Sequence, residues 1–372
     1  MLRNYLGIIN LDEDTKDIRA LTTRRNTASV PIGGRYRVID FALSNMVNAG
    51  INHVCVFSEN STRSLSDHLS NGRPWDLDRK IGGLYIIHNG LMEDILNSDK
   101  RVFENNMDLL DKITEDNIII SSSYMLCNID LEAVAEAHEK AGAQITAVYK
   151  SVTDADIHFV NCNTFNITKT GKISSAARNI GRKKEADICM EIFVMKKELL
   201  CDLLFKAANE GLRSKLKDYI AAHISEYDVY GYKFEGYLSC VNTIDNFYRT
   251  NMDMLNIATM GSLFNKTRPI YTKTKDSPPV KYYKNSFVSN SLVADGTVVK
   301  GKIVNSVVSR GVIIEEGAEI DGCVILQNAI IGKDAKLINV IVDKGVVIEE
   351  NSDIRCPKHN PLTLERKSRF KG

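Results

Sequence analysis

The sequence lacks the features that mark membrane, secreted or nucleic-acid-binding proteins. No apolar run approaches the roughly 18 residues that a membrane-spanning helix requires. The chain opens without a basic segment followed by an apolar one, so we expect neither membrane insertion nor secretion. The 48 Lys and Arg residues balance 47 Asp and Glu residues to a net charge of +1. A chain so nearly neutral has no overall field that would attract nucleic acid, and we expect no nucleic-acid partner.

Cysteine and histidine are present without the spacing of a disulfide framework or a metal site. The eight cysteines are scattered, with no C-x-x-C pair, which favours reduced thiols in a cytoplasmic protein. None of the seven histidines lies in an H-E-x-x-H motif or another ligand spacing. The sequence therefore predicts a cytoplasmic protein without a metal site built on these residues.

The first 262 residues alternate short apolar runs with amphipathic stretches. The apolar runs are rich in Ile and Val, as buried strands are; they cover residues 5–9, 53–57, 117–122 and 143–149. Helical spacing of apolar residues is seen at 44–49, 102–113, 131–140 and 196–208. Alternating strands and helices predict a Rossmann-like α/β domain at 1–262, with a mostly parallel sheet covered by helices on both faces.

The pattern changes its period after a linker at 263–284, which holds Pro269, Pro278 and Pro279. Aliphatic residues then recur every six positions in triplets, and each triplet repeats after 17 positions; they are Val308, Ile314, Ile320, Ile325, Ile331, Leu337, Val342, Ile348 and Ile354. Hexads in triplets predict a left-handed parallel β-helix of three to four coils at 285–372, with one inward aliphatic side chain per face and turn. The basic tail at 366–371 is expected to fray.

Four segments, in order along the chain, carry a family resemblance. Residues 21–25 read LTTRR and lead into VPIGGRYRVIDFALSN at 30–45; VNTIDNFYRTNMD follows at 241–253 and PPVKY at 278–282. Together with an α/β domain joined to a β-helix, this series resembles bacterial glucose-1-phosphate adenylyltransferase (ADP-glucose pyrophosphorylase). The resemblance implies a nucleotidyltransferase domain. In that family the enzyme uses Mg²⁺ to transfer AMP from ATP to glucose 1-phosphate, and it releases pyrophosphate and supplies ADP-glucose for glycogen.

The residues that this chemistry requires are missing. Residues 10–16, NLDEDTK, replace the Gly-rich loop whose backbone N–H groups would hold the triphosphate. Ser123 and Cys240 stand where the resemblance implies two aspartates that bind Mg²⁺, and neither side chain suits a hard dication. Thr27 replaces a lysine, and the family's sugar-phosphate and nucleobase motifs are absent at 172–178 and 98–102. These losses predict a chain without catalytic residues, metal or cofactor.

Cations that the resemblance links to effector binding are retained. Arg24 and Arg25 align with basic residues that bind an anionic sugar-phosphate effector in bacterial members of the family. Lys344 stands where the family's β-helix contributes another cation, and Arg35 flanks the glycine turn at 33–34. Guanidinium groups form charge-assisted, bidentate bonds to phosphate. The four residues predict an effector site, and the alternative is a set of solvated surface charges.

The favoured function is a non-catalytic regulatory subunit, similar to the GlgD type of Gram-positive bacteria, that modulates a catalytic paralogue in a heterotetramer. The alternative is an active sugar-phosphate nucleotidyltransferase with relocated metal ligands. The acidic run at 12–14 could supply such ligands, although neighbouring acids in a loop are more often solvated. A hexapeptide-repeat acyltransferase is a third class, but such enzymes need a basic histidine near the coils, and residues 286–356 contain none.

Overall fold

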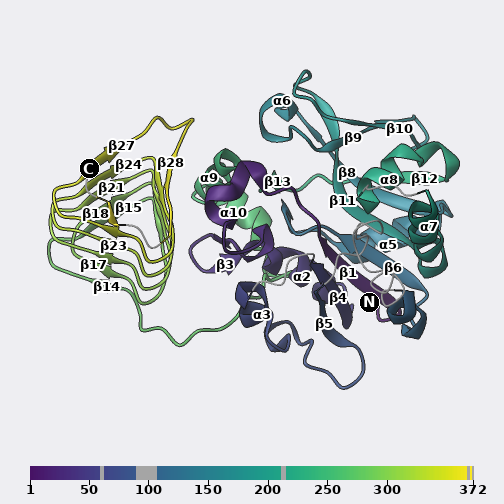
Figure 1. Ribbon diagram of the computed structural model, residues 1–372, viewed down its shortest axis with the longest axis horizontal. Helices are drawn as coiled ribbons and strands as arrows, with labels where there is room; N and C mark the ends of the chain where they lie inside the picture. Colours follow the sequence, from purple (N-terminus) through teal and green to yellow (C-terminus); the bar gives the residue numbers. More distant parts are fainter. Residues whose placement is uncertain (59–62, 89–106, 211–214, 367–368, 371–372) are drawn as a thin grey trace. The chain divides into compact units, whose positions relative to one another are not determined.

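The computed structural model describes residues 1–58, 63–88, 107–210, 215–366 and 369–370 (Figure 1). Residues 98–102, the start of the helix predicted at 102–113 and part of the tail at 366–371 lie outside these ranges. The chain forms two compact units. The first contains Met1–Glu13, Phe41–Cys240 and Lys266–Tyr271, and the second contains Asp14–Asp40, Val241–Asn265 and Thr272–Gly372. The domain limits 1–262, 263–284 and 285–372 stay a prediction.

Within the described residues, the first unit is built on one nine-stranded sheet, in the order β10-β9-β11-β6-β1-β4-β5, with β8 paired to β11 and β12. Its parallel strands β6, β1, β4 and β5 span Asn117–Ser121, Tyr5–Leu11, His53–Ser58 and Gly83–Ile87. Every residue of β1 and β6 is buried, as expected of a parallel sheet covered on both faces. These strands confirm the predicted Rossmann-like core.

The rest of the sheet pairs around β11 (Ala186–Lys196), which is antiparallel to β6, β8 and β9. β8 (Ile145–Val152) confirms the strand predicted at 143–149, and β12 (Val229–Lys233) runs parallel to it. The hairpin of β9 (Asn163–Ile167) and β10 (Ile173–Arg178) was not predicted. Only Ile173 of β10 is fully buried, so the strand lacks the apolar run by which a buried strand is recognised.

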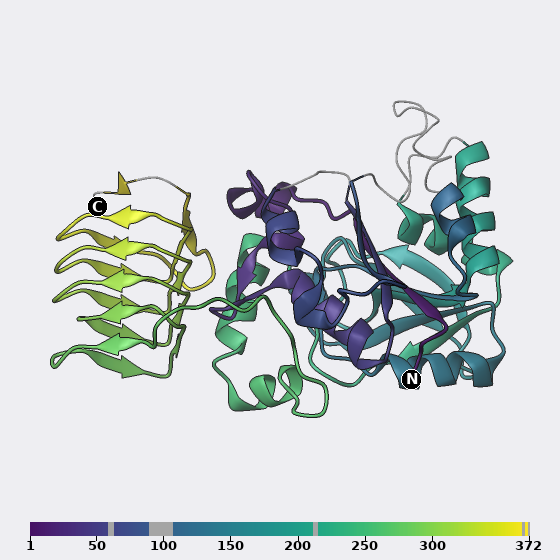
Figure 2. The ribbon, with the colours of Figure 1, turned by 90° about the horizontal axis from the view of Figure 1, so that it is seen from below.

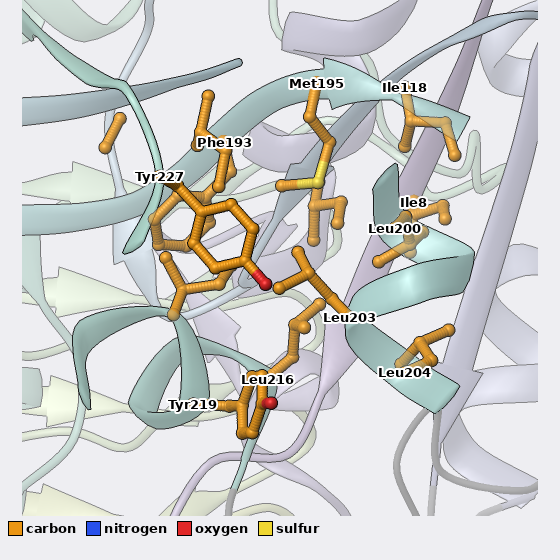
Figure 3. Packing of buried hydrophobic residues seen from close by; sticks show 14 of the residues in the cluster. Ile8, Ile118, Phe193, Met195, Leu200, Leu203, Leu204, Leu216, Tyr219 and Tyr227 are labelled. Carbon is orange, nitrogen blue, oxygen red and sulfur yellow. The ribbon is translucent and has the colours of Figure 1, made fainter. Parts of the chain in front are cut away.

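One face of the sheet is covered by α7 (Lys197–Asn209) and α8 (Leu216–Ala222). Figure 3 labels side chains of α7 that share one buried cluster with side chains of β1, β6 and β11, namely Leu200, Leu203, Leu204, Ile8, Ile118 and Met195. The cluster confirms the helix predicted at 196–208. Burial of these aliphatic side chains is the main force that holds α7 to the sheet.

The opposite face of the sheet receives α2 (Val38–Asn48). Gly7 of β1 makes room for it, because a Cβ at Gly7 would lie 3.2 Å from Met46 Sδ. α2 begins six residues before the helix predicted at 44–49. At its start Asp40 Oδ2 accepts a hydrogen bond from the Arg37 N–H at 2.9 Å, which satisfies a backbone donor at the first turn.

The helix predicted at 131–140 is confirmed as α5 (Leu131–Ala141). Asp130 caps its start by accepting hydrogen bonds from the N–H groups of Glu132 and Ala133, and Gly142 ends it at a φ of 62°. Both ends therefore follow the residue preferences that the sequence displays. None of the helices in the described ranges is long and apolar enough to cross a lipid bilayer.

The second unit contains a parallel β-helix, whose stacked coils are seen in Figure 2. The first face stacks β14, β17, β20, β23, β26 and β29, which span Lys281–Tyr282, Val298–Val299, Ile313–Ile314, Ile330–Ile331, Val347–Ile348 and Arg369–Phe370. The second stacks β15, β18, β21, β24 and β27, which span Phe287–Ser289, Lys302–Val304, Glu319–Asp321, Lys336–Ile338 and Asp353–Arg355. The third stacks β16, β19, β22, β25 and β28, which span Leu292–Val293, Val307–Val308, Val324–Ile325, Val340–Val342 and Leu362–Leu364.

The aliphatic triplets predicted from the sequence lie in register inside this β-helix. Val308 pairs with Ile325, and Ile314 pairs with Ile331, in each case 17 positions along the chain. The side chains of the triplets line one core, which is fully buried along most of its length. The hexad interpretation is confirmed.

The β-helix has more coils than the sequence predicted. Its faces stack five or six strands among the described residues, so the prediction of three to four coils is wrong. The spacing of 17 breaks at both ends: Phe287 pairs with Lys302 after 15 positions, and Val340 pairs with Leu362 after 22 positions. The outer coils therefore keep no fixed period that a sequence pattern could reveal.

Two further segments belong to the second unit. Residues 14–40 form α1 (Arg19–Thr22) and a hairpin of β2 (Pro31–Ile32) and β3 (Tyr36–Arg37). Residues 241–265 form α9 (Ile244–Asp253) and α10 (Ile257–Leu263). Tyr248 of α9 donates a hydrogen bond to the carbonyl of Gly322 in the β-helix at 2.6 Å. Buried side chains thus join α9 to the coils.

Candidate functional site

The carboxyl ends of β1 and β6 form the edge of the sheet at which an α/β fold binds ligands. β1 lies between β4 and β6, and the chain passes from β1 to β4, so the strand order turns between β1 and β6. Open α/β sheets bind their ligands outside the carboxyl ends of the strands at such a point. Here Asp12 and Glu13 follow β1, and Ser122, Ser123 and Tyr124 follow β6.

Two of the predicted lost ligand positions lie at this edge. Ser123 is buried and donates a hydrogen bond to Glu13 Oε1. Cys240 lies in β13 (Ser239–Cys240), which pairs with β7 (Met125–Leu126) directly after Tyr124. Its Sγ is 3.5 Å from Cys162 Sγ, and burial raises the pKa of Cys240 well above its ordinary value. A neutral hydroxyl and a protonated thiol therefore occupy these positions.

The third lost position, Thr27, belongs to the second unit. It lies in a 3₁₀ turn at Thr27–Ser29 and is buried. Its Oγ1 has no hydrogen-bond partner within the ranges that the structure describes. The segment 172–178, which lacks the family's sugar-phosphate motif, forms β10 in the first unit. Its Arg178 lies 3.8 Å from Asp218.

A largely buried ion pair lies at the edge of the sheet where β1 and β6 end. Lys217 Nζ of α8 lies 2.6 Å from Glu191 Oε1 of β11, and the side chains are 13% and 4% exposed. Tyr124 donates a hydrogen bond to the same Glu191 oxygen, and Lys217 Nζ lies 2.9 Å from the Tyr124 hydroxyl. Burial lowers the pKa of Lys217, but attraction to Glu191 and Asp12 outweighs it and raises the pKa overall. Lys217 is therefore charged.

The acidic run after β1 takes part in this network. Burial raises the pKa of Asp12 to about 7 against the opposing attraction of Lys217. Burial likewise raises the pKa of Glu13, against the hydrogen bond from Ser123. Only Asp14 of the three acids is exposed. The interpretation of residues 12–14 as a solvated acidic loop is thus incomplete, because Asp12 and Glu13 are half-buried near Lys217 of α8 and Glu191 of β11.

The space left between these side chains is small among the residues that the structure describes. A cavity of about 20 Å³ is lined by Asn10, Asp12, Ile120, Ser121, Ser122, Glu191, Phe193, Leu216 and Lys217. That volume holds about one water molecule. Across the described residues, no group of three or more His, Cys, Asp or Glu side chains could hold a metal ion. The residues present do not fit the Mg²⁺ that the family uses.

The predicted effector residues Arg24 and Arg25 have different surroundings in the second unit. Arg25 is buried: its Nε donates to the Leu21 carbonyl and its Nη2 to Asp343 Oδ1, both at 2.6 Å. Arg24 is exposed. A cavity of about 100 Å³ beside them is lined by Ala20, Leu21, Thr23, Arg24, Arg25, Asp343, Glu365 and Arg366. Arg25 is therefore held by Asp343, whereas Arg24 is available to a ligand.

Lys344 belongs to a group of cations that we name the cation cluster: Arg35, Arg37, Lys275, Arg310, Lys344 and Arg366. Burial lowers the pKa of Lys344, as do Arg366, Lys275, Arg37 and Arg25. Burial, Arg37 and Arg310 also lower the pKa of Lys275. No carboxylate is among the charges that shift either lysine within the described part of the chain. Such mutual repulsion favours binding of an anion.

Sequence reasoning missed Arg310, Lys275 and Arg366. Arg310 is only 7% exposed, and its Nε has no hydrogen-bond partner among the described residues. Burial and repulsion from Arg35 lower its pKa, against the opposing attraction of Asp295 and Asp40. Arg310 precedes Lys344 by 34 positions, which is twice the coil period of 17. The coil period could therefore have predicted that Arg310 and Lys344 lie on the same face of the β-helix. No sequence pattern predicts that Lys275 lies near them.

Comparisons with known proteins agree with this fold. Residues 16–158 match a nucleotidyl transferase family model, and residues 278–360 match a model of the GlmU-like C-terminal hexapeptide region. With the three sheets of stacked parallel strands, the second match confirms the left-handed β-helix.

Whole-chain relatives carry two names. The glycogen biosynthesis protein GlgD of Bacillus subtilis (strain 168) is 30% identical over 333 residues, which cover 89% of this chain and 82% of the relative. GlgD of Geobacillus stearothermophilus is 32% identical over 326 residues, or 86% and 84% of the two chains. The glucose-1-phosphate adenylyltransferase of Pseudothermotoga lettingae is 28% identical over 327 residues, or 86% and 77%. The chain therefore belongs to the glucose-1-phosphate adenylyltransferase family, together with the GlgD proteins.

Proposed function

We propose that the chain is a non-catalytic regulatory subunit of glucose-1-phosphate adenylyltransferase, acting in glycogen biosynthesis in the cytoplasm. The main support for the proposal is that the chain's own side chains occupy the edge of the sheet where a ligand would bind. The Glu191–Lys217 pair leaves a cavity of about 20 Å³ at the edge of the sheet where an α/β fold binds its ligand. Ser123 and Cys240 add no ligand suited to Mg²⁺. The names of the two GlgD relatives support the link to glycogen.

The partner in this proposal is a catalytic paralogue, with which the chain forms a heterotetramer. One end of the β-helix supports association, because β14, β15 and β16 are edge strands. Tyr282, Tyr283 and Phe287 at this end are 54%, 41% and 55% exposed. Unpaired strand edges beside exposed aromatic side chains favour contact with another chain. Such contact would bias the partner's conformational equilibrium, and couplings of this kind are typically about 1–3 kcal/mol.

The cation cluster supports binding of a sugar-phosphate effector in the second unit. Arg24, Arg35 and Lys344 would contact the phosphate groups. Arg25 would contribute through its ion pair with Asp343, which holds residues 21–25 beside the β-helix. The phosphate would relieve the repulsion that lowers the pKa values of Lys344 and Lys275.

Mixing purified chains tests the regulatory proposal. The chain and its catalytic paralogue should co-elute as a hetero-oligomer on a sizing column, and the paralogue's rate or effector response should change. The variant Phe287→Ser tests the proposed contact surface, because Phe287 is 55% exposed and adds little to the fold. We expect this variant to weaken the hetero-oligomer while its melting temperature stays unchanged. Separate elution together with unchanged kinetics of the paralogue would overturn the proposal.

A second candidate is an active sugar-phosphate nucleotidyltransferase with relocated metal ligands. Two carboxylates favour it, Asp12 and Glu191, which both act on the charge of Lys217. This function requires pyrophosphate release by the chain alone from ATP, Mg²⁺ and glucose 1-phosphate. A rate at background, unchanged by restoring aspartate with Ser123→Asp and Cys240→Asp, would exclude it.

A further inference from the structure

Glu191 has a backbone conformation that is unusual for a residue with a side chain. Its φ is +55°, in the left-handed region that favours glycine. It lies within β11, where the register with β8 shifts between Cys189 and Phe193. Non-glycine residues keep such a conformation only where surrounding contacts hold it, and these residues concentrate at ligand sites. The contacts of the carboxylate are therefore informative.

The carboxylate of Glu191 occupies a preformed set of donors. One oxygen, Oε1, accepts hydrogen bonds from Lys217 Nζ at 2.6 Å and from the Tyr124 hydroxyl. Lys217 and Tyr124 come from different elements, and their polar atoms lie 2.9 Å apart. An ammonium and a phenol that converge on one point form a site for a single anionic oxygen. Glu191 supplies that oxygen from within the chain.

The other oxygen of Glu191 faces the small cavity. Glu191 Oε2, Asn10 Oδ1 and Ser122 Oγ have no hydrogen-bond partner among the described residues, and all three residues line the cavity. Asn10 donates through Nδ2 to Asp12 Oδ2 at 2.9 Å, which leaves its Oδ1 free. One water could donate to the two carbonyl-type oxygens and accept from the Ser122 hydroxyl. Phe193 and Leu216, both labelled in Figure 3, close the apolar side.

We propose that Glu191 is a built-in substitute for an anionic ligand, seated with one water in an anion site made by Lys217 and Tyr124. The site would accept an oxygen of a phosphate or a carboxylate once the Glu191 side chain is removed. The inference rests on the proposed function, because it takes this edge of the sheet to be a substrate site that has been lost. It adds which group now occupies that site. Nothing in it depends on the partner subunit.

The variant Glu191→Gly tests the proposal, because glycine suits the φ of +55° while the carboxylate is lost. Without added anions we expect a lower melting temperature, since Lys217 loses the carboxylate to which it donates a hydrogen bond and keeps only the weaker attraction of Asp12 and Asp218. Sodium phosphate or sodium acetate should restore the melting temperature in a saturable manner, compared with sodium chloride at equal ionic strength. The matched control is Asn161→Gly, which also replaces a residue of positive φ (67°) but removes no charge.

The outcomes separate the possibilities. Rescue by phosphate, by acetate or by both supports the built-in ligand and identifies the preferred anion. If Glu191→Gly does not fold alone, its refolding yield should rise with the same anions. The double variant Glu191→Gly with Lys217→Met should respond to either anion no more than the wild-type chain does. A response of Glu191→Gly equal to that of the wild-type chain would overturn the inference. That result would leave the regulatory proposal intact, since mixing with the paralogue tests it separately.

Discussion

The ion pair between Arg25 and Asp343 is the contact on which we base the most quantitative prediction. Their side chains are 7% and 4% exposed, and the Arg25 Nη2 lies 2.6 Å from Asp343 Oδ1. Asp343→Ala leaves the guanidinium buried with one hydrogen bond, from Nε to the Leu21 carbonyl. Removing one partner of a buried pair typically costs about 3–5 kcal/mol of unfolding free energy. We expect a loss of that size in urea unfolding followed by circular dichroism.

Two further variants separate charge from local geometry. Asp343 Oδ1 also accepts the Lys344 N–H at 2.7 Å, and Asp343→Asn can keep that bond while it removes the charge. It should therefore lose less stability than Asp343→Ala. The double variant Arg25→Met with Asp343→Leu removes both charges and should recover most of the loss, because apolar replacement of a buried pair is often close to neutral.

The control for this series is Arg24→Ala. Arg24 is the neighbouring arginine, is exposed, and should change the unfolding free energy by no more than about 0.5 kcal/mol. If Asp343→Ala is as mild as Arg24→Ala, the ion pair does not hold residues 21–25 to the β-helix and the reasoning is refuted.

Three other predictions concern pH, packing and anion binding. Asp12 has a pKa of about 7 in the fold against an ordinary 3.8, so the folded chain retains a proton that the unfolded chain releases. Its contribution to stability should therefore fall by up to about 1.4 kcal/mol per pH unit between about pH 4 and 7. The contribution of Asp12 is measured by comparing how the unfolding free energy depends on pH in the wild-type chain and in Asp12→Asn. An equal dependence on pH in the two proteins would contradict the prediction. Leu203→Ala, at a fully buried site in α7, should cost about 2–5 kcal/mol in urea unfolding. Phe205→Ala, on the same helix but at a side chain 58% exposed, should change little. Inorganic phosphate should raise the melting temperature of the wild-type chain more than that of Lys344→Gln, and equal protection would argue against the cation cluster as an anion site.

Much of the fold could be predicted because its signals are local. The triplets from Val308 to Ile354 mark inward side chains directly, and the runs at 5–9 and 117–122 are strands buried on both faces. β10 was missed because only one of its six residues is fully buried, and a strand is recognised in a sequence by its buried apolar positions. The outer coils were missed because their spacing changes from 17 to 15 or 22 positions.

The candidate site could be predicted only in part. Sequence reasoning identified Ser123 and Cys240 as positions without a metal ligand, because each stands in a recognisable segment. It did not find Glu191 or Lys217, which lie 26 residues apart on β11 and α8. Their pairing depends on tertiary packing, which also half-buries Asp12 and Glu13. The left-handed φ of Glu191 could not be predicted, because glutamate is not a residue type that favours this conformation.

We propose above all that the chain acts through a partner and not through its own chemistry. The most direct measurement is the rate of ADP-glucose formation by a fixed amount of the catalytic paralogue as this chain is added. We predict that the rate or its effector dependence changes and then saturates at a fixed ratio of subunits. A flat rate across the titration, at every effector concentration, would contradict the account.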